Sequence, residues 1–69
     1  MVAGLVEVLS DPDARVRAEA AEALGRMGSA GREAIPALKK ASQDENRQVR
    51  KEAREALETL EREQSPERK

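Results

Sequence analysis

Cysteine, histidine and all three aromatic residue types are absent from this sequence of 69 residues. Without cysteine no disulfide can form, and without cysteine or histidine the common soft and borderline metal sites are excluded, which leaves only carboxylates as ligands for a hard cation. Without aromatic residues the core must be aliphatic. It is expected to be thin, because twelve of the hydrophobic residues in the sequence are alanine. The lack of cysteine fits a reducing compartment, and we predict a cytoplasmic protein.

A strong net charge and a long apolar segment are also missing. Thirteen basic and fourteen acidic residues give a net charge of −1, although charged residues make up 39% of the chain. This balance is typical of a solvated helical surface and argues against binding to nucleic acid or to an anionic membrane. No apolar stretch reaches the length of a membrane span, and no basic region precedes an apolar stretch as in a signal peptide. We therefore expect no membrane partner and place nucleic acid last among possible partners.

The residue patterns on which catalysis and cofactor binding depend are missing as well. The sequence contains no base–nucleophile pair, no glycine-rich phosphate loop and no carboxylate pair that stands apart from charged helical surface. Its acidic residues fall where a solvated helix would place them. The sequence therefore predicts a protein that is not an enzyme and that holds no cofactor or metal.

What the sequence does contain is an internal repeat. The segment DPDARVRAEAAEALGRM begins at Asp11, and its counterpart DENRQVRKEAREALETL begins 33 residues later at Asp44. A period of this length predicts a stacked-repeat architecture, in which neighbouring units bury each other's apolar faces. The identical residues at matched positions include the pairs Asp11 and Asp44, Val16 and Val49, Arg17 and Arg50, Ala20 and Ala53, Ala23 and Ala56, and Leu24 and Leu57.

Hydrophobic periodicity places two helices in the first half of the chain. The first is expected at residues 2–9 and should end before Pro12. A strand is the competing interpretation there because valine is frequent, but the match to a clearly helical segment in the second copy favours a helix. The second helix is expected at residues 14–27 with Asp13 as its N-cap, and residues 28–31 should form a stop and a linker.

Two further helices are expected in the second half. One covers residues 32–42, where Pro36 is tolerated because it lies near the start of the helix. The other covers residue 47 to about residue 62, and Asn46 is a suitable N-cap for it. Residues 63–69 have no apolar side chain to anchor them and are expected to form a flexible tail.

The two copies share an apolar helix followed by the patterns D-x-[DN]-x-x-V-R and A-x-x-A-L. These patterns resemble HEAT-like repeats of the kind also found in the phycobiliprotein (bilin) lyase family. The resemblance covers residues 1–62, which would form a single domain of two repeats, residues 1–28 and residues 32–62. It implies an all-α fold, an α-α superhelix (solenoid) in which four helices form two antiparallel pairs.

The resemblance also implies a role for the repeated aspartate and arginine. In such repeats these residues commonly form an inter-repeat ladder of charge-assisted hydrogen bonds. Carried over to this sequence, Arg17 and Arg50 would reach the turn carboxylates of Asp11 and Asp44. We expect a structural role, because a repeated Asp–Arg pair is better explained by partly buried pairing than by binding of an anionic ligand.

Positions at which the copies differ indicate whether each end of the repeat stack carries a polar, capping face. The second copy is more polar, since Lys51 matches Ala18 and Glu58 matches Gly25, so we expect it to be a C-terminal cap. The first copy has no such cap, which predicts a homodimer through the N-terminal helix or the C-terminal part of a longer solenoid, ahead of a two-repeat monomer. The candidate residues for self-association are Val2, Leu5, Val6, Val8 and Leu9.

Together these features predict a protein–protein interaction or scaffold module that recognises another protein along the second helix of each repeat. The alternative, which the resemblance implies, is an accessory or regulatory subunit of a chromophore lyase or of another modifying enzyme. The lack of aromatic residues and cysteine counts against pigment binding. The candidate partner surface comprises Ala14, Ala18, Glu22, Gly25, Arg47, Lys51, Glu55 and Glu58.

Overall fold

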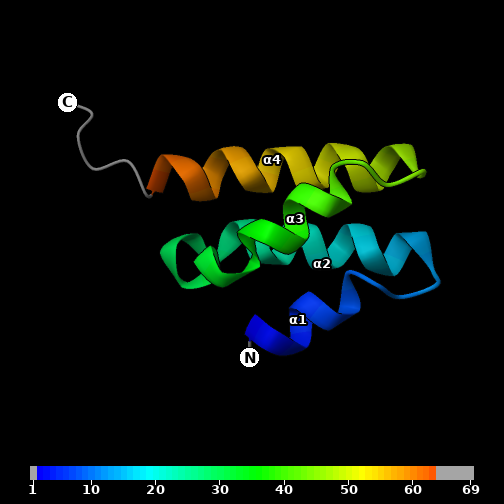
Figure 1. The fold of residues 1–69 in the computed structure, drawn as a ribbon, viewed down its shortest axis with the longest axis horizontal. Helices are drawn as coiled ribbons and strands as arrows, with labels where there is room; N and C mark the ends of the chain where they lie inside the picture. Colours follow the sequence, from blue (N-terminus) through cyan, green and yellow to red (C-terminus); the bar gives the residue numbers. More distant parts are fainter. Residues whose placement is uncertain (1, 64–69) are drawn as a thin grey trace.

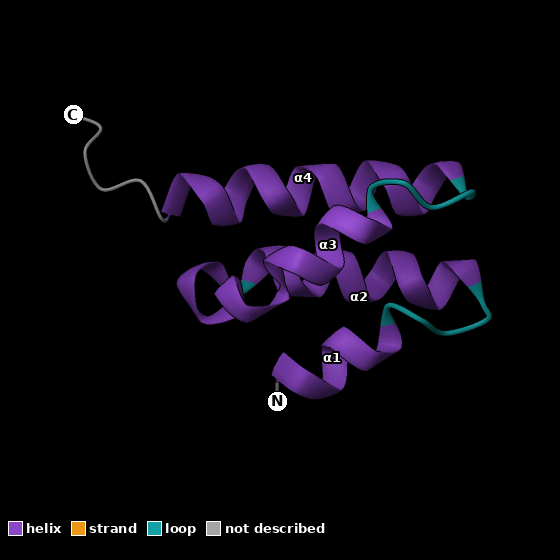
Figure 2. Cartoon of the chain, in the orientation of Figure 1, coloured by secondary structure: helices purple, strands orange, loops and turns teal. Residues whose placement is uncertain are grey.

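Four α-helices and one 3-10 helix are formed within residues 2–63, the part of the chain that the computed structural model describes, apart from the side chains of residues 2, 3, 29–31 and 63. Helices alone are present in this part of the chain, as Figure 2 shows, which confirms the all-α class and the helical interpretation of the first segment. In chain order the elements are α1 (Val2–Val8), α2 (Ala14–Arg26), η1 (Gly28–Ala34), α3 (Ile35–Ala41) and α4 (Arg47–Glu63) (Figure 1).

The helices form two antiparallel pairs, as predicted. Figure 1 shows α1 running back against α2, and α3 running back against α4. The two long helices, α2 and α4, pack against each other along the longest dimension of the molecule, which measures 39 × 24 × 16 Å. The 3-10 helix η1 contacts all four α-helices and so lies where the two pairs meet. We refer to α1 with α2 as the first repeat and to α3 with α4 as the second repeat.

Side-chain caps fix the starts of the two long helices. The Asp13 side chain accepts a hydrogen bond from the backbone N–H of Arg15 at 2.9 Å. At the matching position the Asn46 side chain accepts from the backbone N–H of Val49 at 3.1 Å. Each cap satisfies one of the amide groups that have no partner in the first turn of a helix. Both predicted N-caps are thus present.

The connection between the repeats differs from the predicted linker. Gly28 has a φ of 60° and ends α2, as expected for a glycine that follows the C-cap residue. The chain then winds as the 3-10 helix η1, and α3 begins only at Ile35, three residues later than predicted. Pro36 gives the reason, because its missing N–H is tolerated in the first turn of an α-helix, which places the helix start immediately before it. The predicted tail lies outside the described residues except at residue 63, where α4 ends.

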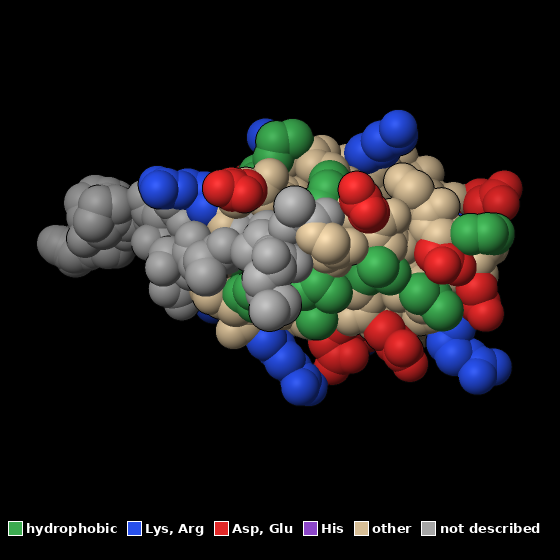
Figure 3. Space-filling view, turned by 90° about the horizontal axis from the view of Figure 1, so that it is seen from below, with side chains coloured by type: hydrophobic (Ala, Val, Ile, Leu, Met, Phe, Trp, Pro, Cys, Tyr) green, Lys and Arg blue, Asp and Glu red, His purple; other side chains and the backbone are tan. Residues whose placement is uncertain are grey.

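The core lies between the helix pairs and is aliphatic, as expected from the composition. Its fully buried large side chains are Leu24, Leu38, Val49 and Leu60, and most of the remaining buried positions are alanine. Hydrophobic side chains also remain visible on the α1 side of the molecule, where charged side chains surround them (Figure 3). In the described part of the chain, no helix combines the length and the apolar character needed to cross a membrane.

Candidate functional site

The turns that lead into α2 and α4 share one hydrogen-bond pattern. In the first turn, Asp11 Oδ1 accepts a hydrogen bond from the backbone N–H of Asp13 at 2.8 Å. Arg17 Nη1 donates to the carbonyl oxygens of Asp11 and Pro12 at 2.7 and 3.1 Å. Each repeat thus uses the arginine of its second helix to hold the backbone of its own turn.

The second turn repeats these contacts. Asp44 Oδ1 accepts from the backbone N–H of Asn46 at 2.8 Å, and Arg50 Nη1 donates to the carbonyl oxygens of Asp44 and Glu45 at 2.9 and 3.0 Å. Both arginines therefore bind the backbone of their own turns, and of the carboxylate contacts that the resemblance implied, the one from Arg17 to Asp44 is present among the described residues. The carboxylate oxygens of the two aspartates are used differently.

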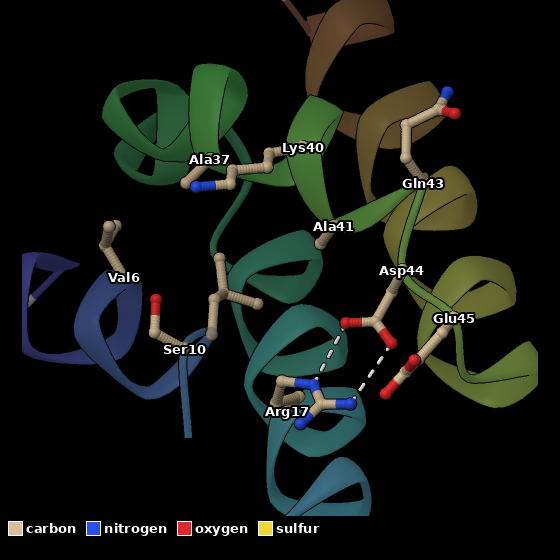
Figure 4. A pocket seen from close by; sticks show the side chains of 10 residues that line it. Val6, Ser10, Arg17, Ala37, Lys40, Ala41, Gln43, Asp44 and Glu45 are labelled. Atoms are coloured by element: carbon tan, nitrogen blue, oxygen red, sulfur yellow. Dashed lines mark hydrogen bonds and ion pairs between the residues drawn. The ribbon is translucent and has the colours of Figure 1, made fainter. Parts of the chain in front are cut away.

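A two-pronged ion pair joins the two repeats. Arg17 Nε lies 3.0 Å from Asp44 Oδ2, and Arg17 Nη2 donates to Asp44 Oδ1 at 3.1 Å (Figure 4). The two side chains are only 14% and 16% exposed, so this pair is largely shielded from solvent. Arg50 makes no such contact with a carboxylate among the described residues. The Nε–Nη2 edge of Arg17 faces the following repeat, and within residues 2–63 no repeat follows Arg50.

The pKa of the Asp44 carboxyl is lowered below its ordinary value of 3.8. The largest cause is the hydrogen bond from the backbone N–H of Asn46, followed among the lowering effects by the hydrogen bond and charge of Arg17 and by the charge of Arg50. Partial burial acts in the opposite direction but does not cancel these effects. Ionised Asp44 is therefore favoured by the folded structure.

This lowered pKa predicts how stability depends on pH. A carboxyl whose pKa is lower in the folded than in the unfolded chain stabilises the fold above the unfolded pKa, and this contribution is lost as the pH falls through the folded pKa. The difference in free energy of unfolding between the wild type and Asp44→Asn should therefore be constant at neutral pH and shrink below pH 3.8. Urea denaturation at a series of pH values measures this difference. A difference that does not change with pH would contradict the assignment.

An open hollow of about 680 Å³ separates α1 from α3 (Figure 4). Val6, Leu9, Ala37 and Ala41 form its apolar wall, and the Arg17–Asp44 pair lies at its edge. The hydrogen-bonding groups of that pair are already engaged with each other and with the turns. The hollow therefore offers packing surface, and its ion pair is not free for acid–base or nucleophilic chemistry.

A second depression follows the line where α2 packs on α4, and we call it the α2–α4 groove. It consists of two adjoining hollows of about 340 and 250 Å³ that share Glu22 and Glu52. Its floor is made of small residues. At Gly25 the two helices approach so closely that an added Cβ atom would lie only 3.0 Å from the Cα and Cβ atoms of Ala56. The residues of the floor are Ala14, Ala18, Gly25 and Ala56, and the charged residues of the rim are Arg15, Glu19, Glu22, Arg26, Glu52 and Glu55.

The rim of the groove is predominantly negative, with four acidic side chains and two basic ones. Arg26 donates to Glu22 at 2.9 Å and Lys51 pairs with Glu55 at 3.2 Å, both as exposed contacts within one helix. The hydrogen bond to Glu55 raises the pKa of Lys51 above its ordinary value, and the charges of Glu55, Glu52 and Glu22 add to this effect. Glu22 belongs to the other helix, so the negative potential extends across the groove.

The groove contains only part of the predicted partner surface. Ala14, Glu22 and Glu55 line it. Ala18 and Gly25 are buried and form its floor, so they do not belong to an exposed ridge. The close packing of α4 on α2 covers them, and the sequence did not show that contact. The remaining three residues are exposed on α4 beyond the groove lining, namely Arg47, Lys51 and Glu58.

Sequence reasoning did not find four residues of the rim. Two of these four, Glu19 and Glu52, occupy matched positions in the two repeats. A search for specificity only where the copies disagree passes over such residues. The sequence signal for such residues is a set of acidic side chains that repeats on the exposed faces of two helices that pack in parallel. The two basic residues of the rim, Arg15 and Arg26, follow the same exposed stripe of α2.

The residues predicted for self-association are distributed between core and surface. Leu9 is 8% exposed and belongs to the core. Leu5, Val6 and Val8 are partly buried against the core, so each retains some solvent exposure. The side chain of Val2 lies outside the described part of the structure. The apolar helix α1 is therefore only partly covered by the residues that the structure describes.

Comparison with known families finds a match to a family described as HEAT repeats, over residues 2–67. This range includes both repeats. Searches among curated proteins and among solved structures gave no significant match.

Proposed function

The chain belongs to the HEAT-repeat family, and we propose that it is a non-enzymatic protein-binding module that receives a basic segment of its partner in the α2–α4 groove. Repeats of this family commonly bind other proteins. The observation that supports the proposal for this chain is the combination of a floor of small residues with a predominantly acidic rim. Such a groove admits a polypeptide segment closely and attracts lysine or arginine side chains.

The rim is suited to exchange of ion pairs. The contacts that Arg26 makes with Glu22 and that Lys51 makes with Glu55 are exposed, and exposed pairs of this kind contribute at most about 1 kcal/mol each. A basic partner can therefore displace them at little cost. Among the described residues Glu19 has no ion-pair partner, which leaves it available to the bound segment.

Panning a random peptide display library against the protein tests this function. We expect the enriched peptides to carry an excess of lysine and arginine. Their affinity should fall about tenfold for the double variant Glu22→Gln with Glu52→Gln, because these residues line both hollows of the groove. The matched control, Glu7→Gln with Glu33→Gln, removes the same charge from exposed positions outside the groove lining and should leave the affinity unchanged. Equal affinities for both double variants would contradict the proposal.

An accessory role beside a chromophore lyase is the second function that the resemblance suggests. It is supported by the repeat type alone. A coloured complex on mixing the protein with a bilin would favour it over the protein-binding role.

A further inference from the structure

The two repeats are buried to different extents at matched positions, although their own helices pack in the same way. Leu38 and Val49 of the second repeat are completely buried. Their counterparts in the first repeat, Leu5 and Val16, are only partly buried. Leu60 is likewise completely buried, whereas its counterpart Met27 is only partly buried. Because the first repeat covers the second on this side, the difference marks the face of the first repeat that the described residues leave uncovered.

On the opposite side of each repeat, the residues of the first repeat are the more buried ones. Ala18, Ala21 and Gly25 of the first repeat are buried where the second repeat packs on them. The second repeat carries exposed charged residues at the matched positions, which are Lys51, Arg54 and Glu58. The C-terminal face of the molecule is thus closed by long charged side chains, whereas its N-terminal face has no such cover.

The inter-repeat ion pair is also incomplete on the N-terminal face. The Asp44 carboxylate accepts from a backbone N–H of its own turn and from two nitrogen atoms of Arg17. Asp11 has the same turn geometry, but among the described residues its carboxylate accepts only from the backbone N–H of Asp13. An arginine that reached the Asp11 carboxylate from a neighbouring repeat, as Arg17 reaches the Asp44 carboxylate, would complete the pattern.

From these observations we propose that the N-terminal face, formed by α1 and the adjoining side of α2, is a docking surface for the C-terminal face of another helical-repeat protein. This partner would present small side chains against Val16 and Met27 and an arginine to Asp11. The interface between the two repeats shows the geometry of such a contact, since small residues and Arg17 cover the second repeat in the same way. Figure 3 shows the α1 side of the molecule, where hydrophobic side chains are visible among charged ones.

A second copy of this chain does not fit as the partner in that geometry. Gly25 approaches Ala56 so closely that a Cβ atom would lie 3.0 Å from the neighbouring backbone. At the position matching Gly25 a second copy would present Glu58, and beside it the charges of Lys51 and Arg54. The partner must therefore carry small residues at these positions.

The proposal can be tested by giving the protein such a C-terminal face. The open-faced variant combines Arg47→Ala, Lys51→Ala, Arg54→Ala and Glu58→Gly, which reproduce the matched residues of α2, and it keeps Arg50. We expect circular dichroism to show a folded helical protein. Sedimentation velocity should show head-to-tail assemblies that grow with concentration, whereas the wild type should remain a species of 7.6 kDa.

Asp11→Asn in the open-faced variant should weaken this association about tenfold, because it removes a charge-assisted pair with Arg50 of the next copy and keeps the turn acceptor. Asp13→Asn is the matched control, since it removes the same charge in the same turn and should leave the association unchanged. A folded open-faced variant that stays monomeric would overturn the proposal, as would equal effects of the two substitutions. A wild-type dimer at micromolar concentration would also overturn it, because the symmetric dimer expected from the sequence would then cover this face.

A tandem chain keeps the proposal testable if the open-faced variant does not fold. In this chain residues 2–34 are duplicated ahead of residues 2–69, which joins Ala34 to Val2 as it is normally joined to Ile35. The urea midpoint should be higher than that of the wild type, and Asp11→Asn in the second copy of the segment should reduce the gain. An unchanged midpoint would overturn the proposal.

Discussion

Replacement of Arg17 by methionine should lower the free energy of unfolding by about 2–3 kcal/mol, because it leaves a largely shielded carboxylate without its charge-assisted hydrogen bonds. The substitution removes both bonds to Asp44 and both bonds to the backbone of the first turn. A core of this size contributes about 3–5 kcal/mol of net stability, so the variant should retain no more than about 3 kcal/mol. Urea denaturation followed by circular dichroism measures the loss.

Arg50→Met is the matched control for this prediction. Arg50 makes the same two backbone contacts with its own turn, but no bond to a carboxylate among the described residues. Its replacement should therefore cost about 1 kcal/mol, which corresponds to the loss of the turn contacts alone. The difference between the two variants isolates the ion pair between the repeats. Equal losses would show that this pair contributes nothing to the stacking.

Gly25→Leu should lower the free energy of unfolding by about 2–3 kcal/mol, because the new side chain forces α2 and α4 apart. The first added carbon would lie 3.0 Å from the Cα and Cβ atoms of Ala56, and a backbone atom cannot turn away as a flexible side chain can. The loss should exceed the helix-propensity gain of about 1 kcal/mol that comes with replacing a glycine. Thermal or urea denaturation gives the sign directly.

Gly4→Leu provides the matched substitution in α1. A Cβ atom at Gly4 has no neighbour within 4 Å, so the new side chain meets open space. The variant should be more stable than the wild type by about 0.5–1 kcal/mol, because the helix gains propensity without a clash. If both glycine variants changed stability in the same direction, the close approach of α2 to α4 would not be the controlling feature.

The fold could be predicted from the sequence because the repeat supplies its own alignment. The period that relates Asp11 to Asp44 also brings the apolar positions of both copies into register, and the caps Asp13 and Asn46 mark the helix starts. The 3-10 helix η1 was not predicted, since its glycine-rich sequence is equally compatible with an irregular linker. Its conformation depends on packing against all four α-helices, and such contacts leave no local signal.

The candidate site was only partly predictable for a similar reason. Exposure at Ala18 and Gly25 depends on the packing of one helix on the other, and small residues are compatible with both a floor and a ridge. The ladder arginines could be found from their repetition and their aspartate partners from the resemblance, but not the contacts with the backbone of their own turns. Arg17 binds the carboxylate of the next repeat and the backbone of its own turn. That choice is set by the direction in which the guanidinium edge points, and it becomes visible only in three dimensions.

The proposed binding role is tested most directly by mapping amide chemical shifts in the isotope-labelled protein as a lysine- and arginine-rich peptide from the display library is added. We predict that the largest changes fall on the α2–α4 groove, at Glu19, Glu22, Glu52 and their neighbours. Changes centred instead on the hollow between α1 and α3, at Val6 and Ala37, would contradict the account.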